Sequence, residues 1–199
     1  GAGEVAVFGA TIQLVVLSGF PLLIAMGTVA PNISALVARK NSHDLNLLLR
    51  TTAQIQFAAS LAITFGILIL GRFALQIVYG DFYKVGVLPM IILAFGYCFN
   101  AWTGLPGLLL NMSGHQKVSM TCGIIAVSLG IATSLLLVPQ IGITGAAIGS
   151  SAGIIAQNLL MLLYCRISFR INTWANISMD SIRRIHRTLI FRKGNFSRF

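Results

Sequence analysis

Acidic residues are scarce in this sequence: Asp and Glu number four among 199 residues, and charged residues of both signs make up 9%. Soluble domains carry about 25% charged residues, so this chain has too few to cover a surface that faces water. General acid–base chemistry needs titratable groups that converge on a pocket, and none of the four acids lies within an apolar run. We therefore expect no catalytic residue, no cofactor and a protein that is not an enzyme.

Cysteine is also rare and gives no sign of a metal site. Cys98, Cys122 and Cys165 lie singly in apolar stretches, with no His or Cys at metal-ligand spacing, and such cysteines are typical small buried hydrophobes. No signal peptide is recognisable, and the chain opens with GAGEVAVFGA, without Met. This opening favours a fragment of a longer protein.

Long apolar runs are what the sequence does contain. Hydrophobic residues make up 56% of it, with a mean hydropathy of +0.87, and a membrane-spanning helix needs roughly 20 apolar residues. We predict an all-α, polytopic transmembrane helix bundle over 1–166, surrounded by the lipid bilayer, and a basic cytoplasmic tail over 167–199. The five expected spans are 5–36, 53–79, 86–110, 118–138 and 144–165.

Lys and Arg fall on alternate connections between these spans. The connections around 38–50 and 111–117 and the tail are basic, 80–84 is balanced, and 139–143 carries no charge. Because cytoplasmic segments collect Lys and Arg, this alternation predicts an outside N-terminus and a cytoplasmic C-terminus. The net charge of +10 is thus a topology signal, and we expect no nucleic-acid partner. The tail is either an interfacial amphipathic helix on anionic lipid or a loosely ordered basic segment.

Prolines and glycines predict where the helices bend and how they pack. Pro21 and Pro31 should kink the first span, Pro106 should bend or break the third, and Pro139 should end the fourth. Small residues recur at spacings of three and four in the fifth, which favours close helix packing over a nucleotide-binding loop; they are Gly142, Gly145, Gly149 and Gly153.

Three polar residues within the spans are candidates for substrate or cavity contacts: Gln13, Arg72 and Asn100. Charged residues at such positions are functional candidates by default, although Arg72 could instead snorkel to the interface. Gln13 and Asn100 could instead bond a neighbouring helix, as could the other buried amides. These amides are Gln54, Gln56, Gln157 and Asn158.

The stretch LLLNMSGHQKVSM at 108–120 is a compact polar interruption between two spans. His115 has no visible partner that would make it a general base. Asn111 or Gly114 could take the left-handed conformation that closes a helix, and Ser113 could cap the next one. We predict a tight turn on the cytoplasmic face rather than an active site.

Four segments together resemble polysaccharide exporters: GLLLNMSGHQK, LLLVPQIGITGAAIGSS, VAPNISAL and IVYGDFYKVGVLPMIILAFG. These exporters are the O-antigen and exopolysaccharide flippases of the multidrug/oligosaccharidyl-lipid/polysaccharide superfamily. The resemblance covers nearly all of 1–165. It departs at 128–134, SLGIATS, where the family often has Asn, and it does not include the tail.

The resemblance implies a multi-pass protein of the bacterial inner membrane that translocates undecaprenyl-diphosphate-linked oligosaccharide by alternating access. Such flippases have two six-helix lobes, and the five spans are similar to the second lobe without its first helix. Because alternating access needs one lobe to rock against the other, we expect a truncated or split copy that lacks an N-terminal lobe and cannot transport alone.

Three other functions remain open. A drug/cation antiporter of the same superfamily has the same architecture. A membrane glycosyltransferase or polysaccharide polymerase component acts on the same lipid-linked substrates, although the outer connections here are short for one. A remnant or partner subunit that does not transport would also fit a missing lobe.

Overall fold

The computed structural model describes residues 2–169 and 173–175. This part of the chain is all helical, without strands, as the sequence predicted. Its elements are α1 (Ala2–Val16), η1 (Leu17–Gly19), α2 (Phe20–Ala38), α3 (Ser42–Tyr79), η2 (Asp81–Gly86), α4 (Val87–Thr103), α5 (Pro106–Met112), α6 (Gln116–Ile141) and α7 (Ile143–Phe169). The predicted amphipathic helix or loose tail after residue 175 lies outside the described residues.

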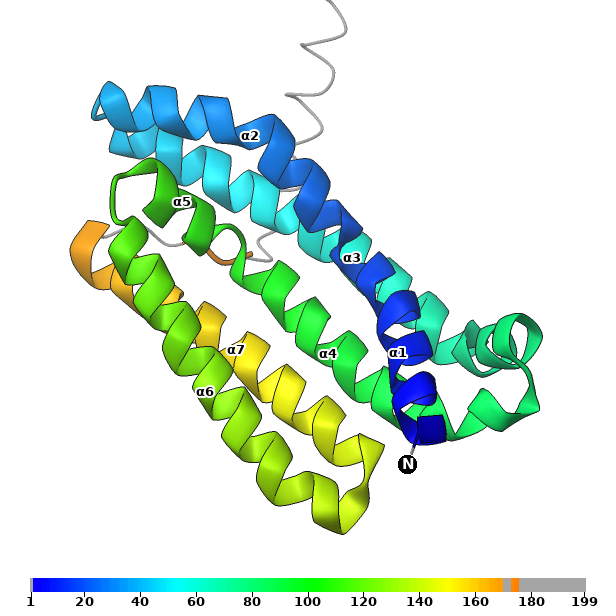
Figure 1. Cartoon of the computed structure of the whole chain (residues 1–199). Coiled ribbons are helices and arrows are strands. Elements are labelled where there is room, and N and C mark those ends of the chain that lie inside the picture. Colours follow the sequence, from blue (N-terminus) through cyan, green and yellow to red (C-terminus); the bar gives the residue numbers. More distant parts are fainter. Residues whose placement is uncertain (1, 170–172, 176–199) are drawn as a thin grey trace, which may run out of the picture.

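Five helical segments in the described ranges are long and apolar enough to cross a membrane. They are Gly3–Ala38, Ser42–Tyr79, Asp81–Thr103, Gln116–Ile141 and Ile143–Phe169. The helices α4 and α5 run through the middle of the bundle, with α2 and α3 on one side and α6 and α7 on the other (Figure 1). The most extensive packing is between α6 and α7, and α7 and α3 both pack against α4.

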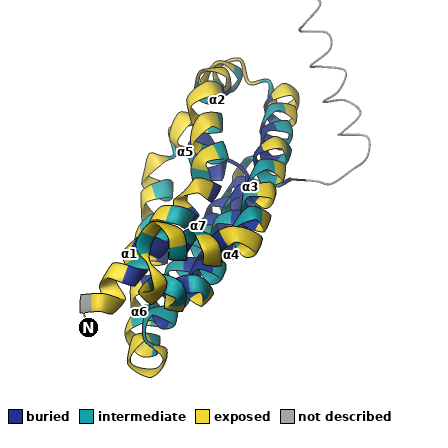
Figure 2. Ribbon diagram, turned by 90° about the vertical axis from the view of Figure 1, so that its right-hand side faces the viewer, coloured by how far each residue is buried: buried dark blue, intermediate teal, exposed yellow. Residues whose placement is uncertain are grey.

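The bundle exposes many large apolar side chains and buries some polar ones among its apolar core; Figure 2 marks the exposed and the buried positions along the helices. Large apolar side chains stand exposed along the helices, among them Ile77, Leu135 and Ile167. The buried polar side chains include Gln56 and Asn158. Hydrocarbon is as apolar as these exposed side chains, so the surface suits a bilayer, whereas the buried polar groups can bond between helices.

The first predicted span is kinked where expected. A 3-10 turn, Leu17–Gly19, separates α1 from α2, and Pro21 lies in the first turn of α2. Proline is tolerated there because the first amide groups of a helix have no intrahelical partner. Pro31 lies inside α2 without ending it.

The predicted break at Pro106 is also confirmed. Helix α4 ends at Thr103, Gly104 has φ +84°, and α5 begins at Pro106. Gly104 adopts a backbone conformation that L side chains disfavour, and Pro106 supplies the fixed φ of a first helical residue. The third predicted span is therefore two helices joined by an angular break.

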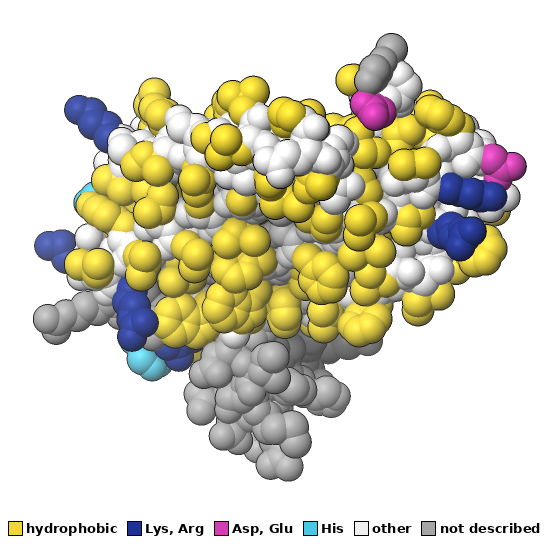
Figure 3. Space-filling model, turned by 90° about the horizontal axis from the view of Figure 1, so that it is seen from below, with side chains coloured by type: hydrophobic (Ala, Val, Ile, Leu, Met, Phe, Trp, Pro, Cys, Tyr) yellow, Lys and Arg dark blue, Asp and Glu magenta, His cyan; other side chains and the backbone are white. Residues whose placement is uncertain are grey.

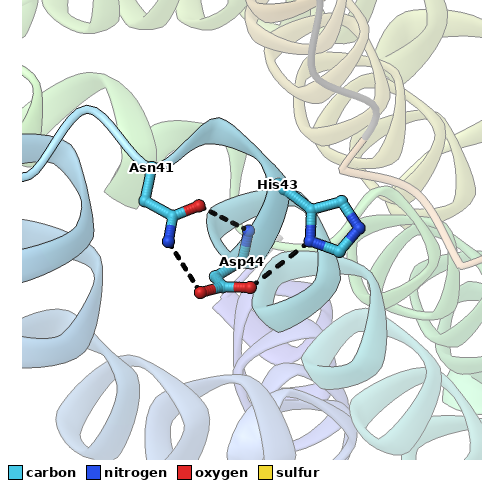
Figure 4. Close-up of polar contacts among 3 residues, drawn as sticks. All are labelled: Asn41, His43 and Asp44. Carbon is cyan, nitrogen blue, oxygen red and sulfur yellow. Dashed lines mark hydrogen bonds and ion pairs between the residues drawn. The ribbon is translucent and has the colours of Figure 1, made fainter.

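The second predicted span begins earlier than expected. We predicted a start at residue 53, but α3 begins at Ser42 because Asn41 caps it (Figure 4). The Asn41 Oδ1 accepts a hydrogen bond from the backbone amide of Asp44 at 3.2 Å, and its Nδ2 donates to Asp44 Oδ2 at 2.7 Å. Leu45 and Leu49 then bury one helical face in the core, so the polar residues around them lie on the exposed face.

The prediction for Pro139 was wrong by about half a turn. Pro139 lies inside α6, which continues to Ile141 and ends at Gly142, with φ +59°. The backbone amide of Gly142 donates to Val138 O at 2.9 Å. Proline disrupts hydrogen bonding towards the preceding turn, whereas a glycine with positive φ reverses the chain, and here the glycine sets the end.

The predicted close packing of the glycine-rich span is confirmed. A Cβ on Gly145 would lie 2.6 Å from the carbonyl carbon of Leu137, and one on Gly153 would lie 3.2 Å from Ala126 O. Real side chains essentially never come within 3.0 Å in this way. The backbone of helix α7 thus meets the backbone of α6 directly, as small residues permit.

More of the basic side chains lie at one end of the bundle than at the other, where they lie close to an acidic side chain (Figure 3). The end with more of them joins the α2–α3 connection, the α5–α6 turn and the end of α7, since residues of all three line one cavity of about 220 Å³. We name it the basic end; its described Lys and Arg are Arg39, Lys40, Arg50, Lys117 and Arg166. The basic connections therefore share one end, as the alternation predicted, and the side of the membrane that this end faces remains a prediction.

Candidate functional site

The turn at the basic end is a structural feature rather than a reactive one. Gly114 has φ +81°, as predicted for a residue in this turn. The His115 ring packs edge-on against Phe169 at 5.1 Å between centroids, and its Nδ1 lies 3.0 Å from Ser113 O. The prediction that Ser113 caps the next helix was wrong: the N-cap of α6 is His115, without a side-chain cap hydrogen bond, and Ser113 Oγ donates to Leu110 O.

A second feature, the α4–α5 break, brings polar groups together inside the bundle. The Thr103 Oγ1 donates to Asn100 O at 2.7 Å and lies 3.2 Å from Asn158 Oδ1 on α7. Asn158 also donates from Nδ2 to Ile154 O at 2.8 Å. The last turn of α4 and the middle of α7 are therefore joined by a buried hydrogen-bonded network, and such networks fix side chains in place.

A cavity of about 340 Å³ opens beside this network. Its walls come from α2, α4, α5, α6 and α7, and the break itself, Gly104–Leu105, forms part of one wall. Leu22 and Met26 supply an apolar side from α2. The polar side chains that line it are Tyr97, Asn100, Asn111, Ser119, Gln157 and Asn158.

None of the described residues that line this cavity carries a charge. Amide side chains both donate and accept hydrogen bonds, and hydroxyl groups do the same. The arrangement therefore suits a neutral polar group, such as a sugar hydroxyl or an amide, more than a phosphate or a metal ion. Among the described residues, no group of three or more His, Cys, Asp or Glu could hold a metal.

A neighbouring cavity of about 360 Å³ follows the glycine contact between α6 and α7. Ile154 and Gln157 line both cavities, so the two are adjacent along α7. Ser134 and Ser150 supply hydroxyl groups to the second one. Gln157 therefore stands at the junction between a polar cavity and a groove lined mostly by small and apolar residues.

The structure separates the three candidate residues of the sequence analysis. Asn100 lines the polar cavity, whereas Gln13 and Arg72 do not. Gln13 is exposed on α1, where its Oε1 accepts a hydrogen bond from the Tyr79 hydroxyl at 2.7 Å. Arg72 is exposed on α3, beside the exposed Phe73.

Sequence reasoning undervalued the amides of α7 and missed Ser119. Gln157 and Asn158 were noted only as amides that could bond a neighbouring helix, and Asn111 only as a turn residue. The cavity unites them because α5, which follows the break at Gly104, and α6 both pack against α7. A proline two residues after a glycine was the signal for that break, but its neighbours depend on the packing.

Comparison with known proteins identifies the family. The model of the family described as "Lipid II flippase MurJ" matches residues 10–193, whereas no curated protein and no solved structure matches the sequence. The match confirms the expected class, a flippase for a lipid-linked precursor within the same superfamily, but it does not support the O-antigen branch. It also extends into the basic segment that the resemblance did not include. A match over most of the sequence shows that the chain belongs to the MurJ lipid II flippase family.

Proposed function

We propose that this chain works in the translocation of lipid II, a lipid-linked cell-wall precursor, across the bacterial inner membrane by alternating access. The observation that carries the proposal is the family match over residues 10–193. Five candidate spans and an uncharged polar cavity between them support it. The family is one of transporters, and this agrees with the expectation that the chain is not an enzyme.

The cavity beside the α4–α5 break is the proposed contact for the neutral part of the head group. Sugar hydroxyls and peptide amides present donors and acceptors in close succession, which the side chains of Asn100, Gln157 and Asn158 can complement. The diphosphate is expected elsewhere, because a charged group without a cation is costly to take out of water. Gln13 and Arg72 stay predicted contacts outside this cavity.

Lipid-linked O-antigen oligosaccharide, the cargo expected from the sequence, presents similar hydroxyl groups. The family description favours lipid II over it. A drug/cation antiporter is less well supported, since none of the described residues that line the polar cavity is acidic and could hold a cation.

We further propose that these helices act as one lobe that moves against a second set of helices, because alternating access requires two parts around a substrate site. On this proposal, the chain alone does not restore growth to bacterial cells depleted of their own lipid II flippase. Restored growth by the chain alone would contradict the need for a second lobe, and would leave the cargo proposal intact.

Binding to the purified protein tests the cargo independently of transport. The protein in lipid nanodiscs is titrated with fluorescent lipid II, with undecaprenyl diphosphate that lacks the head group, and with a lipid-linked O-antigen unit. We expect lipid II to bind most tightly. Gln157→Leu and Asn100→Leu should each weaken lipid II binding about fivefold, the effect of roughly one lost hydrogen bond.

Gln140→Leu is the matched control. Gln140 is an exposed amide on α6 whose Nε2 donates to Leu136 O of its own helix, so its replacement should leave binding unchanged. Equal binding of lipid II and undecaprenyl diphosphate would overturn the role of the cavity. Tighter binding of the O-antigen unit than of lipid II would favour a polysaccharide precursor as the cargo.

A further inference from the structure

A short segment after α7 lies against the break between α4 and α5. The backbone amide of Ala175 donates to Trp102 O in the last turn of α4 at 2.9 Å. Thr173 and Ala175 are buried, at 0% and 4% exposed. We call Thr173–Ala175 the strap.

The strap occupies the space that a side chain on Gly104 would need. A Cβ on Gly104 would collide with Thr173 O, and it would lie 3.0 Å from the Cβ of Ala53 on α3. The strap and α3 therefore both lie directly against Gly104, the one residue of the break that has positive φ. A glycine is required here for the close approach as well as for the backbone conformation.

The break has a second neighbour, the polar cavity. Gly104 and Leu105, together with Pro106–Leu108 of α5, line that cavity. One short stretch of the protein is thus contacted by the strap and also forms a wall of the proposed head-group site. Any rotation of α5 relative to α4 would therefore change the contact with the strap and the shape of the cavity together.

Among the residues that the structure describes, few directional interactions hold the strap. Besides the Ala175–Trp102 hydrogen bond, the guanidinium of Arg166 lies over the Trp174 ring, 5.4 Å from its centroid. The Thr173 Oγ1 is buried and has no hydrogen-bond partner among the described residues. A buried hydroxyl without a partner loses its hydration without compensation, which costs free energy. The strap should therefore dissociate from the break more readily than a segment whose polar groups are all hydrogen-bonded.

We propose that the strap is a releasable clamp on the α4–α5 hinge, and that its release frees α5 to move relative to α4 and reshapes the polar cavity. Breaks between helices are where hinge motions concentrate, because a few residues there absorb the change in backbone angles. The inference goes beyond the proposed cargo, since it holds for any ligand of the cavity.

A native cysteine reports on this hinge. The Sγ of Cys165 on α7 lies 3.8 Å from Pro106 O, the first residue of α5, and Cys165 is fully buried. In the 199-residue protein with Cys98→Ala and Cys122→Ala, Cys165 is the sole thiol. Its rate of reaction with N-ethylmaleimide in nanodiscs should rise when α5 moves away.

The test displaces the strap by Thr173→Lys, because a long charged residue does not fit in a fully buried site next to Gly104. We expect Cys165 to react at least about fivefold faster, because local opening at the break would expose its thiol to the reagent more often. Thr173→Val keeps the size of the side chain and removes only the unpartnered hydroxyl, so Cys165 should react no faster than in the parent.

A second reporter separates hinge opening from general unfolding. Cys98 lies on α4 rather than on α5, the helix proposed to move, and it becomes the sole thiol with Cys122→Ala and Cys165→Ala. Its rate should not change with Thr173→Lys. An unchanged rate at Cys165 overturns the proposal, and so does equal acceleration at both thiols, which would make the strap an ordinary part of the fold. The assay needs no lipid II, so its outcome is independent of the cargo.

Discussion

Gly130 of α6 and Gly149 of α7 lie directly against each other, and each leaves no room for a side chain on the other. A Cβ on Gly149 would lie 2.7 Å from Gly130 O, and a Cβ on Gly130 would lie 3.0 Å from Gly149 O. Neither helix can accept a side chain at this crossing unless the two backbones separate. Since lipid provides no hydrophobic force between helices, such close packing is a main source of their association.

Gly149→Ala should therefore destabilise the α6–α7 pair. Overpacking a tight interface costs about 1–3 kcal/mol, and we expect a lower midpoint of thermal unfolding, measured by circular dichroism in detergent. Gly66→Ala is the control, because Gly66 lies in α3 and a Cβ added there would meet nothing within 4 Å. Equal midpoints for the two variants would show that the glycine contact is unimportant.

Gly104→Ala and Gly80→Ala form a second matched pair. Both glycines have positive φ, +84° and +98°, but only Gly104 is crowded, whereas nothing lies within 4 Å of a Cβ on Gly80. These positive-φ conformations are sparsely populated by residues other than glycine, and they cost each alanine about 1–3 kcal/mol. Gly104→Ala should lower the unfolding midpoint further, because it also pushes against Thr173 O. A larger effect at Gly80 would contradict the close approach of the strap.

The ion–aromatic contact in the strap gives a spectroscopic prediction. The sequence has two tryptophans, and Trp102→Phe leaves only Trp174. In that background, Arg166→Gln removes the cation over the Trp174 ring, a contact worth about 0.5–2 kcal/mol. We expect red-shifted emission and stronger quenching by acrylamide. Arg166→Lys should stay closer to the parent, and identical spectra for all three would show that the contact does not hold Trp174.

The positive-inside alternation predicts that the basic end faces the cytoplasm. A cysteine at His43, which is exposed at that end, should react with a membrane-impermeant maleimide only in inverted vesicles. A cysteine at Gln140, exposed near the opposite end of α6, should react in intact spheroplasts. Both are introduced into a variant without the three native cysteines. The opposite pattern would invert the predicted topology.

Patterns local in the sequence predicted much of the fold. Apolar length predicted the number of spans, and Pro21 and Pro106 marked the kink and the break because proline acts on its own turn. The start of α3 was misplaced, although its signal is also local: Asn41 followed three residues later by Asp44 is a helix-start pattern. The many polar residues before residue 53 favoured a connection rather than a helix. Leu45 and Leu49, which are buried, nevertheless have the spacing of one helical face.

The candidate site was harder to predict because it depends on which helices become neighbours. Asn100 could be chosen as a polar group within a span, but its proximity to Gln157 follows from the packing of α4 on α7. Gln13 is bonded to Tyr79 across α1 and α3, a pairing that no local pattern indicates. The strap was not predicted at all, since three residues carry no periodicity.

The length of α3 has a consequence for the depth of the basic end. Its 38 residues make a rod of about 57 Å at about 1.5 Å per residue, nearly twice the roughly 30 Å of bilayer hydrocarbon. Tilt alone would have to reach about 58° to hide that length, beyond the roughly 0–40° that spanning helices adopt. Part of helix α3 must therefore project beyond the hydrocarbon. We expect this part to be the turns that follow Asn41, because they carry His43 and Asp44, whose polar side chains are exposed there and favour water or lipid head groups.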